Sequence, residues 1–424
     1  MLIALLFLHY KNNLKLEYQY HILNNGIKVI HRKISGTVSH CGLMVNTGSR
    51  DENENESGIA HLIEHLIFKG TNKRKAYHVL SRIENVGGDL NAFTTKEETC
   101  VYASFLSPYY IHSLELFADV AFNSIFPQKE LDKEKEIVID EINSYNDSPA
   151  ELIFDDFEDL IFAGHSLGKN ILGSINKIRS INRKDIFRFI KTKYSTDQMV
   201  IASVGQIKFS KLIYLTEKYF GAIPASFSKV DRSAFDSYKP KDETTPKNSY
   251  LSHCMIGNIA YPRVHPNKLP LLLISNLLGG PALNSRLSIQ IREKYGYAYN
   301  IESMYQPYSD TGIFNVYIGS DKKYVNKSID LVHRELKKLR KDKLGTMQLH
   351  TAKRQLTGQL AISSESFLNE MLGIAKTNLY KSRVNSITEI IADIEKITAE
   401  QILEVANEIF NPLHLSTLIY KAGD

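Results

Sequence analysis

Alternating apolar and polar positions open the chain and predict a pair of antiparallel strands. The apolar side chains alternate between Tyr18 and Ile30 on either side of the turn sequence Asn24-Asn25-Gly26, a pattern typical of a β-hairpin. Strand-like segments recur at residues 40–46 and 99–106. Elsewhere the apolar positions recur every three or four residues, which predicts helices. The predicted helices cover residues 57–68, 75–86, 108–125 and 128–145.

A polar stretch with three prolines separates two parts of the chain. Residues 221–250 show little apolar periodicity, which is typical of a linker. The chain has 424 residues, more than the roughly 100–200 residues of a usual single domain. We therefore predict the following division: an N-terminal extension at 1–15, a first domain at 16–222, a linker at 223–249 and a second domain at 250–424.

The two predicted domains share a pattern that indicates duplication. Ser39-His40-Cys41 recurs as Ser252-His253-Cys254, 213 positions later. Residues 97–102 align with residues 309–314 at an offset of 212. Strand segments repeated at nearly one offset predict two related α+β domains, each a mostly antiparallel sheet packed with helices.

A cluster of metal-binding side chains lies in the predicted helix at 57–68. It reads His61-Leu62-Ile63-Glu64-His65, an inverted form of the H-E-x-x-H zinc motif. Histidines four residues apart share one face of a helix, so both imidazoles can reach one cation. Because this helix is otherwise mostly apolar, its polar side chains need a partner, which Zn²⁺ supplies. The equivalent positions of the second domain are apolar: Ile274, Leu277 and Leu278. We therefore expect the chemistry in the first domain and packing or binding in the second.

A zinc ion bound by two histidines needs a third protein ligand if one position is to stay open for water. Glu134 and Glu141 are candidates, because they lie seven residues apart, two turns along one helical face. Spacing alone leaves further candidates open on the same helix: Glu136, Asp140 and Asn143.

Composition and charge exclude several other classes of protein. Hydrophobic residues make up 43% and charged residues 23% of the chain, which excludes a disordered or collagen-like protein. The net charge of +5 is too small to indicate nucleic-acid binding. The apolar run at residues 1–8 is too short to span a bilayer, so we predict no membrane partner. Three cysteines fit a reducing compartment; we predict a cytoplasmic location, and the apolar run leaves periplasmic export open.

Four longer motifs occur in order along the chain: HLIEHLIFKGT at 61–71, GGDLNAFTTKEET at 87–99, EKEIVIDEINSYNDSP at 134–149 and LLGGPALNSRLSIQIREKYGYAY at 277–299. Together they resemble the M16 metallopeptidases, which include pitrilysin, insulin-degrading enzyme and mitochondrial processing peptidase. The chain is similar to the short members, which form one half of a clamshell. This resemblance implies a fold of the LuxS/MPP-like metallohydrolase type and a zinc-dependent endopeptidase activity.

The resemblance also implies roles for single residues around the metal. His61, His65 and Glu141 are the implied zinc ligands, and Glu64 is the implied general base. Glu134 matches a neighbouring glutamate that orients a ligand or supports the base.

On the substrate side, the resemblance implies that Asn91 and Ala92 lie in an edge strand that pairs with a bound peptide. Arg292 and Tyr299 match a substrate-positioning pair from the second domain. Tyr297 stands where a leucine is more usual.

The expected substrates and partners follow from the same resemblance. We expect unfolded or short peptides as substrates. We also expect a homodimer with two complete sites, with a heterodimer with an inactive homologue as the alternative assembly. A noncatalytic peptide-binding or scaffold subunit is the alternative function, although relatives of that kind lack part of the metal set that this chain retains.

Overall fold

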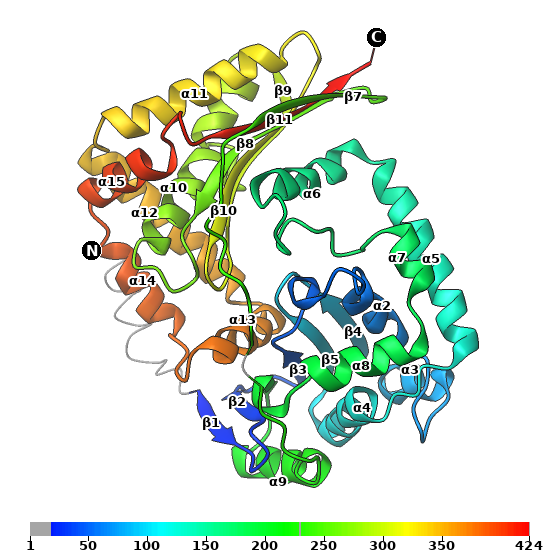
Figure 1. The fold of residues 1–424 in the computed structure, drawn as a ribbon. Coiled ribbons are helices and arrows are strands. Elements are labelled where there is room, and N and C mark those ends of the chain that lie inside the picture. The colour runs from blue at the N-terminus through cyan, green and yellow to red at the C-terminus, as the bar shows by residue number, and fades with distance from the viewer. Residues whose placement is uncertain (1–17, 229, 424) are drawn as a thin grey trace. The chain divides into compact units, whose positions relative to one another are not determined.

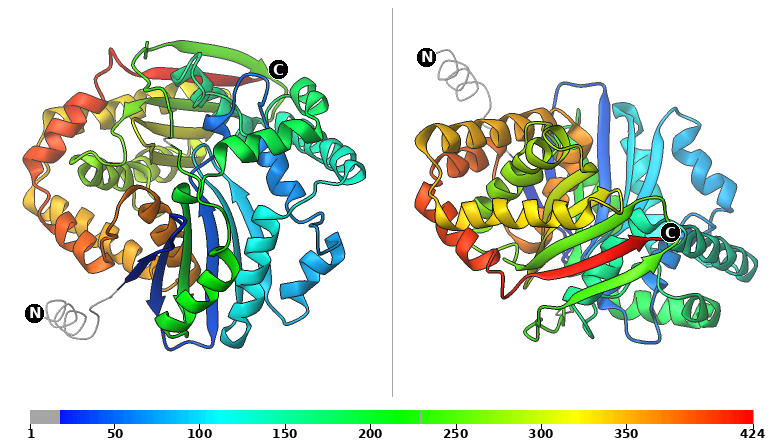
Figure 2. Two further views of the ribbon diagram at one scale, coloured as in Figure 1. Left: turned by 60° about the horizontal axis from the view of Figure 1, so that its bottom comes forward. Right: turned by 90° about the horizontal axis from the view of Figure 1, so that it is seen from above.

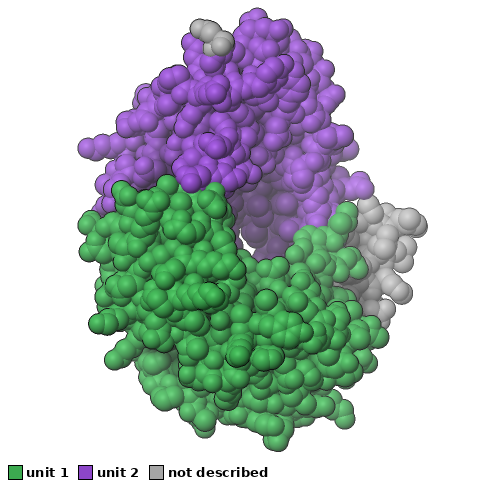
Figure 3. All heavy atoms as spheres, turned by 90° about the vertical axis from the view of Figure 1, so that its right-hand side faces the viewer, with its two compact units in different colours: residues 1–142, 170–232, 362–388 green, residues 143–169, 233–361, 389–424 purple. Residues whose placement is uncertain are grey.

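The structure, a computed structural model, describes residues 18–228 and 230–423. The expected extension at 1–15 lies outside these residues. The chain forms two compact units, each assembled from three separate segments (Figure 3). Of the described residues, the first unit contains 18–142, 170–228, 230–232 and 362–388, and the second contains 143–169, 233–361 and 389–423.

The first unit is built around a six-stranded sheet. Its strands, in spatial order, are β1 (Gln19–Ile22), β2 (Lys28–Lys33), β6 (Met199–Gly205), β3 (Val38–Val45), β5 (Thr99–Leu106) and β4 (Asp89–Thr94). Only the β2–β6 pair is parallel, and the other neighbours are antiparallel. The predicted hairpin is β1–β2, and β4 lies at the opposite edge of the sheet.

The second unit repeats this arrangement with five strands. In spatial order they are β7 (Asp242–Lys247), β11 (Ser416–Ala422), β8 (Ser252–Ala260), β10 (Gly312–Ser320) and β9 (Ala298–Pro307). The β7–β11 pair is again parallel and the others are antiparallel. The repeated Ser-His-Cys segments fall on β3 and β8, which occupy equivalent places in the two sheets. The predicted fold class, two related α+β domains with mostly antiparallel sheets, is confirmed.

Helices cover both faces of each sheet (Figures 1 and 2). Those that begin in the first unit are α2 (Ile59–Leu66), α3 (Ala76–Glu84), α4 (Tyr110–Phe122), α5 (Gln128–Asn146), α7 (Ile175–Ser180), α8 (Arg183–Lys193), α9 (Phe209–Phe220), α13 (Phe367–Tyr380) and α14 (Ile387–Glu395). Those that begin in the second are α6 (Pro149–Ile161), α10 (Lys268–Gly279), α11 (Val325–Lys341), α12 (Thr346–Ser363) and α15 (Ala399–Ile409).

One helix in each unit comes from the other half of the sequence. Helix α13 packs Met371 and Ile374 against β6 and β3 of the first sheet. Helix α6 packs Ile153 and Phe157 against β8 and β11 of the second sheet. The compact units therefore differ from the predicted sequential division at these two helices, because the apolar face of each helix is buried on the sheet formed mainly by the other half of the sequence. The predicted linker at 223–249 also differs in part, since it contains the edge strand β7.

Within residues 18–228 and 230–423, none of the helices combines the length and the apolar character needed to cross a bilayer.

Candidate metal centre

The histidine motif lies on α2, whose N-terminus is capped by a side chain from the preceding loop. Gly58 precedes the helix with a φ of 87°, and a Cβ atom there would lie 2.5 Å from the carbonyl oxygen of Leu172. Glycine is therefore required at this position. The buried Glu52 carboxylate accepts hydrogen bonds from the N–H groups of Gly58 and Ala60, both at 2.9 Å. A carboxylate at this end of the helix also interacts favourably with the helix dipole.

Three side chains converge as a possible metal site. His61 and His65 project from α2, Glu141 projects from α5, and one ligand atom of each lies within 4.8 Å of the others. Oε2 of Glu141 is 3.8 Å from Nε2 of His61 and 3.7 Å from Nε2 of His65. These distances are too long for hydrogen bonds. They are near the roughly 3.3 Å between two ligands of a tetrahedral zinc ion with bonds of about 2.0–2.1 Å.

The donor set therefore fits zinc. Two imidazole nitrogens and one carboxylate oxygen are ligands that this ion accepts, and three protein ligands leave a fourth position for water. Of the acidic residues that spacing left open on α5, Glu141 is the one that joins a group of three such donors among the described residues.

Glu134 lies behind His65 rather than among the three converging side chains. Its Oε2 is 3.3 Å from Nδ1 of His65, and its Oε1 is 2.9 Å from Nζ of Lys69. The tautomer of His65 that carries its proton on Nδ1 can donate to this carboxylate, and it has Nε2 unprotonated on the side of Glu141. By contrast, Nδ1 of His61 is buried with no hydrogen-bond partner in the described part of the chain. Glu134 therefore orients one of the two histidines.

Burial keeps His61 neutral. Its burial, reinforced by the neighbouring His65, lowers its pKa to about 4, so the imidazole is in the form that binds a metal at neutral pH. Burial also raises the pKa of Glu64 above its ordinary value, and this effect is opposed by Thr94 and His65. A raised carboxylate pKa favours proton transfer near neutral pH.

The strand β4 lies next to α2 and has a free edge. Asn91 is exposed and Ala92 is half-buried, and their partners on β5 are Tyr102 and Val101. The N–H of Ala92 donates to Oδ1 of its neighbour Asn91 at 2.9 Å. The sheet thus ends beside α2 in an edge strand, a position at which a further strand can be added.

The expected positioning pair lies in the second unit. Arg292 belongs to a single π-helical turn, η4 (Ser288–Glu293), and its guanidinium pairs with the adjacent Glu293 at 2.9 Å. Tyr299 lies on the edge strand β9 and is 67% exposed. His61, His65 and Glu141 all belong to the first unit, so the role of this pair stays a prediction.

Three residues that contact the candidate metal site or its helix were not predicted from the sequence: Glu52, Lys69 and Thr94. The sequence carries a weak signal for Lys69, which lies four residues after His65. Glu52 lies six residues before Gly58 in a loop, where no periodicity points to it.

Comparison with known protein families assigns both halves of the chain to one family. The profile described as Insulinase (Peptidase family M16) matches residues 28–174, and the profile described as Peptidase M16 inactive domain matches residues 180–356. The uncharacterized zinc protease YmxG of Bacillus subtilis is 30% identical over 90% of this chain and 93% of its own length. The chain belongs to the M16 family of peptidases.

A further relative agrees with this family, and two solved structures agree with the fold. A probable mitochondrial-processing peptidase subunit beta of Schizosaccharomyces pombe is 30% identical over 86% of this chain and 82% of its own length. The crystal structure of a protease from Helicobacter pylori matches with a TM-score of 0.87 at 22% identity, covering 96% of this chain and 99% of that chain. A peptidase M16 inactive domain from Pseudomonas fluorescens matches with a TM-score of 0.89 at 19% identity and the same coverage. The structural matches support the expected fold.

Proposed function

We propose that this chain is a zinc-dependent endopeptidase whose ion is held by His61, His65 and Glu141. The observation that carries the proposal is the convergence of three ligand atoms within 4.8 Å of one another, from two helices of one unit. The zinc proteases among the relatives support the choice of metal.

In this proposal Glu64 moves the proton of the attacking water. Zinc, when bound, lowers the pKa of its water to about 7. Glu64 accepts a proton from the attacking water and delivers it to the nitrogen of the leaving amine. The pKa of Glu64 is raised, which brings it nearer to neutral pH. This suits both steps, because a group with a pKa near the working pH can both accept and release a proton. Glu134 holds His65 in the tautomer that faces the ion.

The substrate is an unfolded or short peptide that pairs with the free edge of β4 at Asn91 and Ala92. Such pairing uses the peptide backbone, so it gives affinity with little sequence preference. Arg292 and Tyr299 position the substrate and stabilise the oxyanion, a role that rests on the family resemblance. We further propose a homodimer, and a cytoplasmic location because the three cysteines are free and buried.

The test combines metal analysis with the cleavage of a quenched-fluorescent peptide library. Wild type should contain one zinc per chain and cleave peptides. Glu64→Gln should retain the zinc and cleave at least about 100-fold more slowly, the usual contribution of a general base. Glu84→Gln, at an exposed position of α3, is the matched control and should cleave like wild type. The mechanism fails if wild type binds no zinc, or if Glu64→Gln cleaves as fast as the control.

Two further measurements address the second unit and the assembly. Arg292→Ala should reduce kcat/KM, and unchanged efficiency would remove this residue from the site. Sedimentation of the active protein should give a dimer, whereas a strictly monomeric active species would contradict the proposed assembly.

A further inference from the structure

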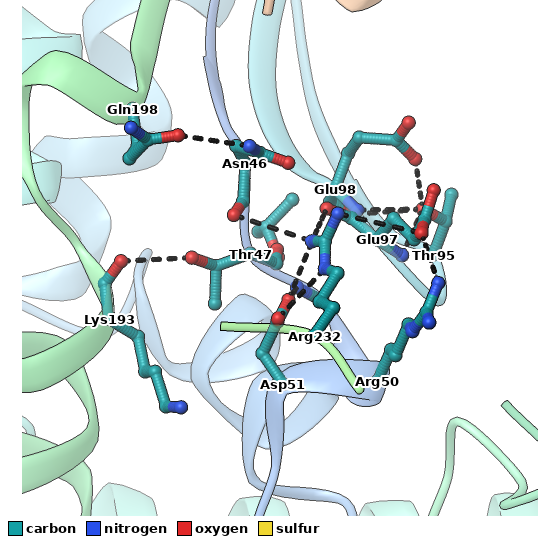
Figure 4. A network of polar contacts seen from close by, with 12 residues as sticks. Asn46, Thr47, Arg50, Asp51, Thr95, Glu97, Glu98, Lys193, Gln198 and Arg232 are labelled. Carbon is teal, nitrogen blue, oxygen red and sulfur yellow. Dashed lines mark hydrogen bonds and ion pairs between the residues drawn. The ribbon is translucent and has the colours of Figure 1, made fainter. Parts of the chain in front are cut away.

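Four buried charged side chains form a cluster in the first unit (Figure 4). Arg50 and Arg232 face Asp51 and Glu97, and none of the four side chains is more than 7% exposed. Arg232 binds Asp51 through two parallel hydrogen bonds of 2.9 and 2.8 Å. Arg50 donates to Glu97 at 2.8 Å. These two cations and two anions therefore face one another where water screens them little.

Arg232 also joins two backbone segments that are distant in the sequence. The same guanidinium donates to the carbonyl oxygen of Glu97 at 2.9 Å and approaches that of Asn46 at 3.5 Å, as Figure 4 shows. Arg232 is the last residue of its segment, because the chain passes into the second unit at Ser233. Its side chain thus anchors the segment that leaves the first unit.

The two segments that Arg232 joins are those that support α2 and β4. The loop before α2 pairs with the β4–β5 turn through Ser49 N–H to Thr95 O, at 3.1 Å, and Arg50 N–H to Lys96 O, at 2.8 Å. A Cβ atom on Gly48 would lie 2.3 Å from the carbonyl oxygen of Thr95, so these segments lie in direct contact. Glu52, which caps α2, follows Asp51 directly in this loop.

A second segment from the C-terminal half of the sequence binds the same turn. Glu98 accepts a hydrogen bond from the hydroxyl of Tyr380 at 3.0 Å, and Nζ of Lys376 lies 3.1 Å from the same carboxylate oxygen. Both partners belong to α13. The β4–β5 turn is therefore bound from one side by Arg232 and from another by α13.

We propose that Arg232 is a positioning residue for the peptidase site, because it fixes the loop that caps α2 and the turn that ends β4 relative to each other. The inference rests on the proposed function and deepens it. Helix α2, which carries the two histidines, and strand β4, which is proposed to bind the peptide, are then both held in place by one buried side chain. This side chain, Arg232, lies on the segment that leads into the second unit. A displacement of about 1 Å between such elements can reduce a rate by about 100-fold.

The alternative role of Arg232 is charge balance alone, and two variants separate the two roles. Arg232→Met leaves the buried Asp51 short of its partner, so its Tm should fall by roughly 5–10 °C. In the double variant Arg232→Met/Asp51→Asn, the unpaired charge is gone, so most of the lost Tm should return. The hydrogen bonds from Arg232 to the carbonyl oxygens of Asn46 and Glu97 remain absent in both.

Activity is measured on the zinc-loaded full chain, at a temperature well below the Tm of every variant. Both Arg232 variants should have a kcat at least 10-fold below wild type with KM changed less than threefold. The control is Arg32→Met, which breaks an ion pair to Glu370 on α13. Arg32 lies on β2, separated from β4 by three strands, so its variant should lose Tm and keep kcat within twofold of wild type.

The outcomes distinguish this inference from the proposed function. If kcat returns together with Tm in the double variant, or if Arg232→Met keeps the wild-type kcat, Arg232 does not position the site and only this inference is overturned. If wild type and Arg32→Met show no zinc-dependent cleavage, the proposed function fails and the inference falls with it.

Discussion

The cap on α2 predicts that a residue without contact to the ion controls zinc affinity. Glu52→Ala removes two hydrogen bonds to the first turn of the helix, from the N–H groups of Gly58 and Ala60. Hydrogen bonds to a charged group contribute about 1.5–3 kcal/mol each, so the lower bound for the pair is about 3 kcal/mol. His61 follows Ala60 directly and lies in the turn that the cap holds.

The loss of these two hydrogen bonds should mainly disorder the first turn of α2. Helices as short as the eight residues of α2 are not stable alone, because forming the first turn is unfavourable. If the whole 3 kcal/mol is needed to reform that turn around the ion, zinc affinity falls by about 100-fold, since 1.36 kcal/mol corresponds to a factor of ten. We expect a decrease of about 10- to 100-fold, and a smaller one for Glu52→Gln, which keeps one acceptor oxygen.

The assay is a zinc titration against a competing chromophoric chelator at pH 7.5, with circular dichroism to verify folding. Glu54→Ala is the matched control, because Glu54 lies on the same loop and is exposed. The reasoning is refuted if folded Glu52→Ala binds zinc as tightly as Glu54→Ala.

Three further predictions follow from the structure. Glu134→Gln should weaken zinc binding by about 10- to 100-fold in the same titration, because its carboxylate orients His65; equal affinity would show that this contact is dispensable. Ala92→Pro should raise the KM for peptides at least 10-fold while the zinc content stays constant, because it removes from the edge strand β4 a backbone N–H that donates to Asn91 Oδ1 in the free protein and that a bound peptide would use; an unchanged KM would place the peptide elsewhere. Burial lowers the pKa of His31 to about 4 from its ordinary 6.5. The neutral, buried His31 therefore contributes its full share to the stability of the folded protein above pH 6.5, and this contribution is lost as the pH falls toward 4. This loss amounts to about 3 kcal/mol, and urea unfolding of His31→Gln should show a correspondingly smaller decrease than wild type over that pH range.

The regular elements were predictable where local patterns determine them. The hairpin β1–β2 follows from alternation around Asn24-Asn25-Gly26, and α2 to α5 follow from apolar positions at helical spacing. The edge strand β4 has only a short pattern of this kind, because the alternation of exposed Asp89 and Asn91 with half-buried Leu90 and Ala92 ends after four residues. Only the family resemblance indicated it.

The packing of α6 and α13 on the sheet formed mainly by the other half of the sequence was not predictable from the sequence. Each helix has an apolar face that a sheet must cover, but an apolar face does not specify which of two similar sheets covers it. The discontinuous units therefore depend on long-range packing, such as that of Met371 on the first sheet and Phe157 on the second.

The candidate metal site was predictable in part. The spacing of His61 and His65 on one helix predicts two candidate ligands, because both side chains share one face. The third ligand was ambiguous, since Glu134 and Glu141 share a face of α5 as well; the structure separates them by placing Glu134 behind His65. No sequence pattern indicated a role for Arg232, because it lies in a segment without periodicity and its partners are distant in the sequence.

The central claim is that His61, His65 and Glu141 bind one zinc ion, and the most direct test is a zinc titration of three proteins. Wild type should bind one zinc per chain tightly, and Glu141→Gln should bind at least 100-fold more weakly. Glu136→Gln should match wild type, because Glu136 is exposed on the same helix and lies outside the group of converging donors. If wild type binds no zinc, or if Glu141→Gln binds as tightly as Glu136→Gln, the proposed metal centre is contradicted.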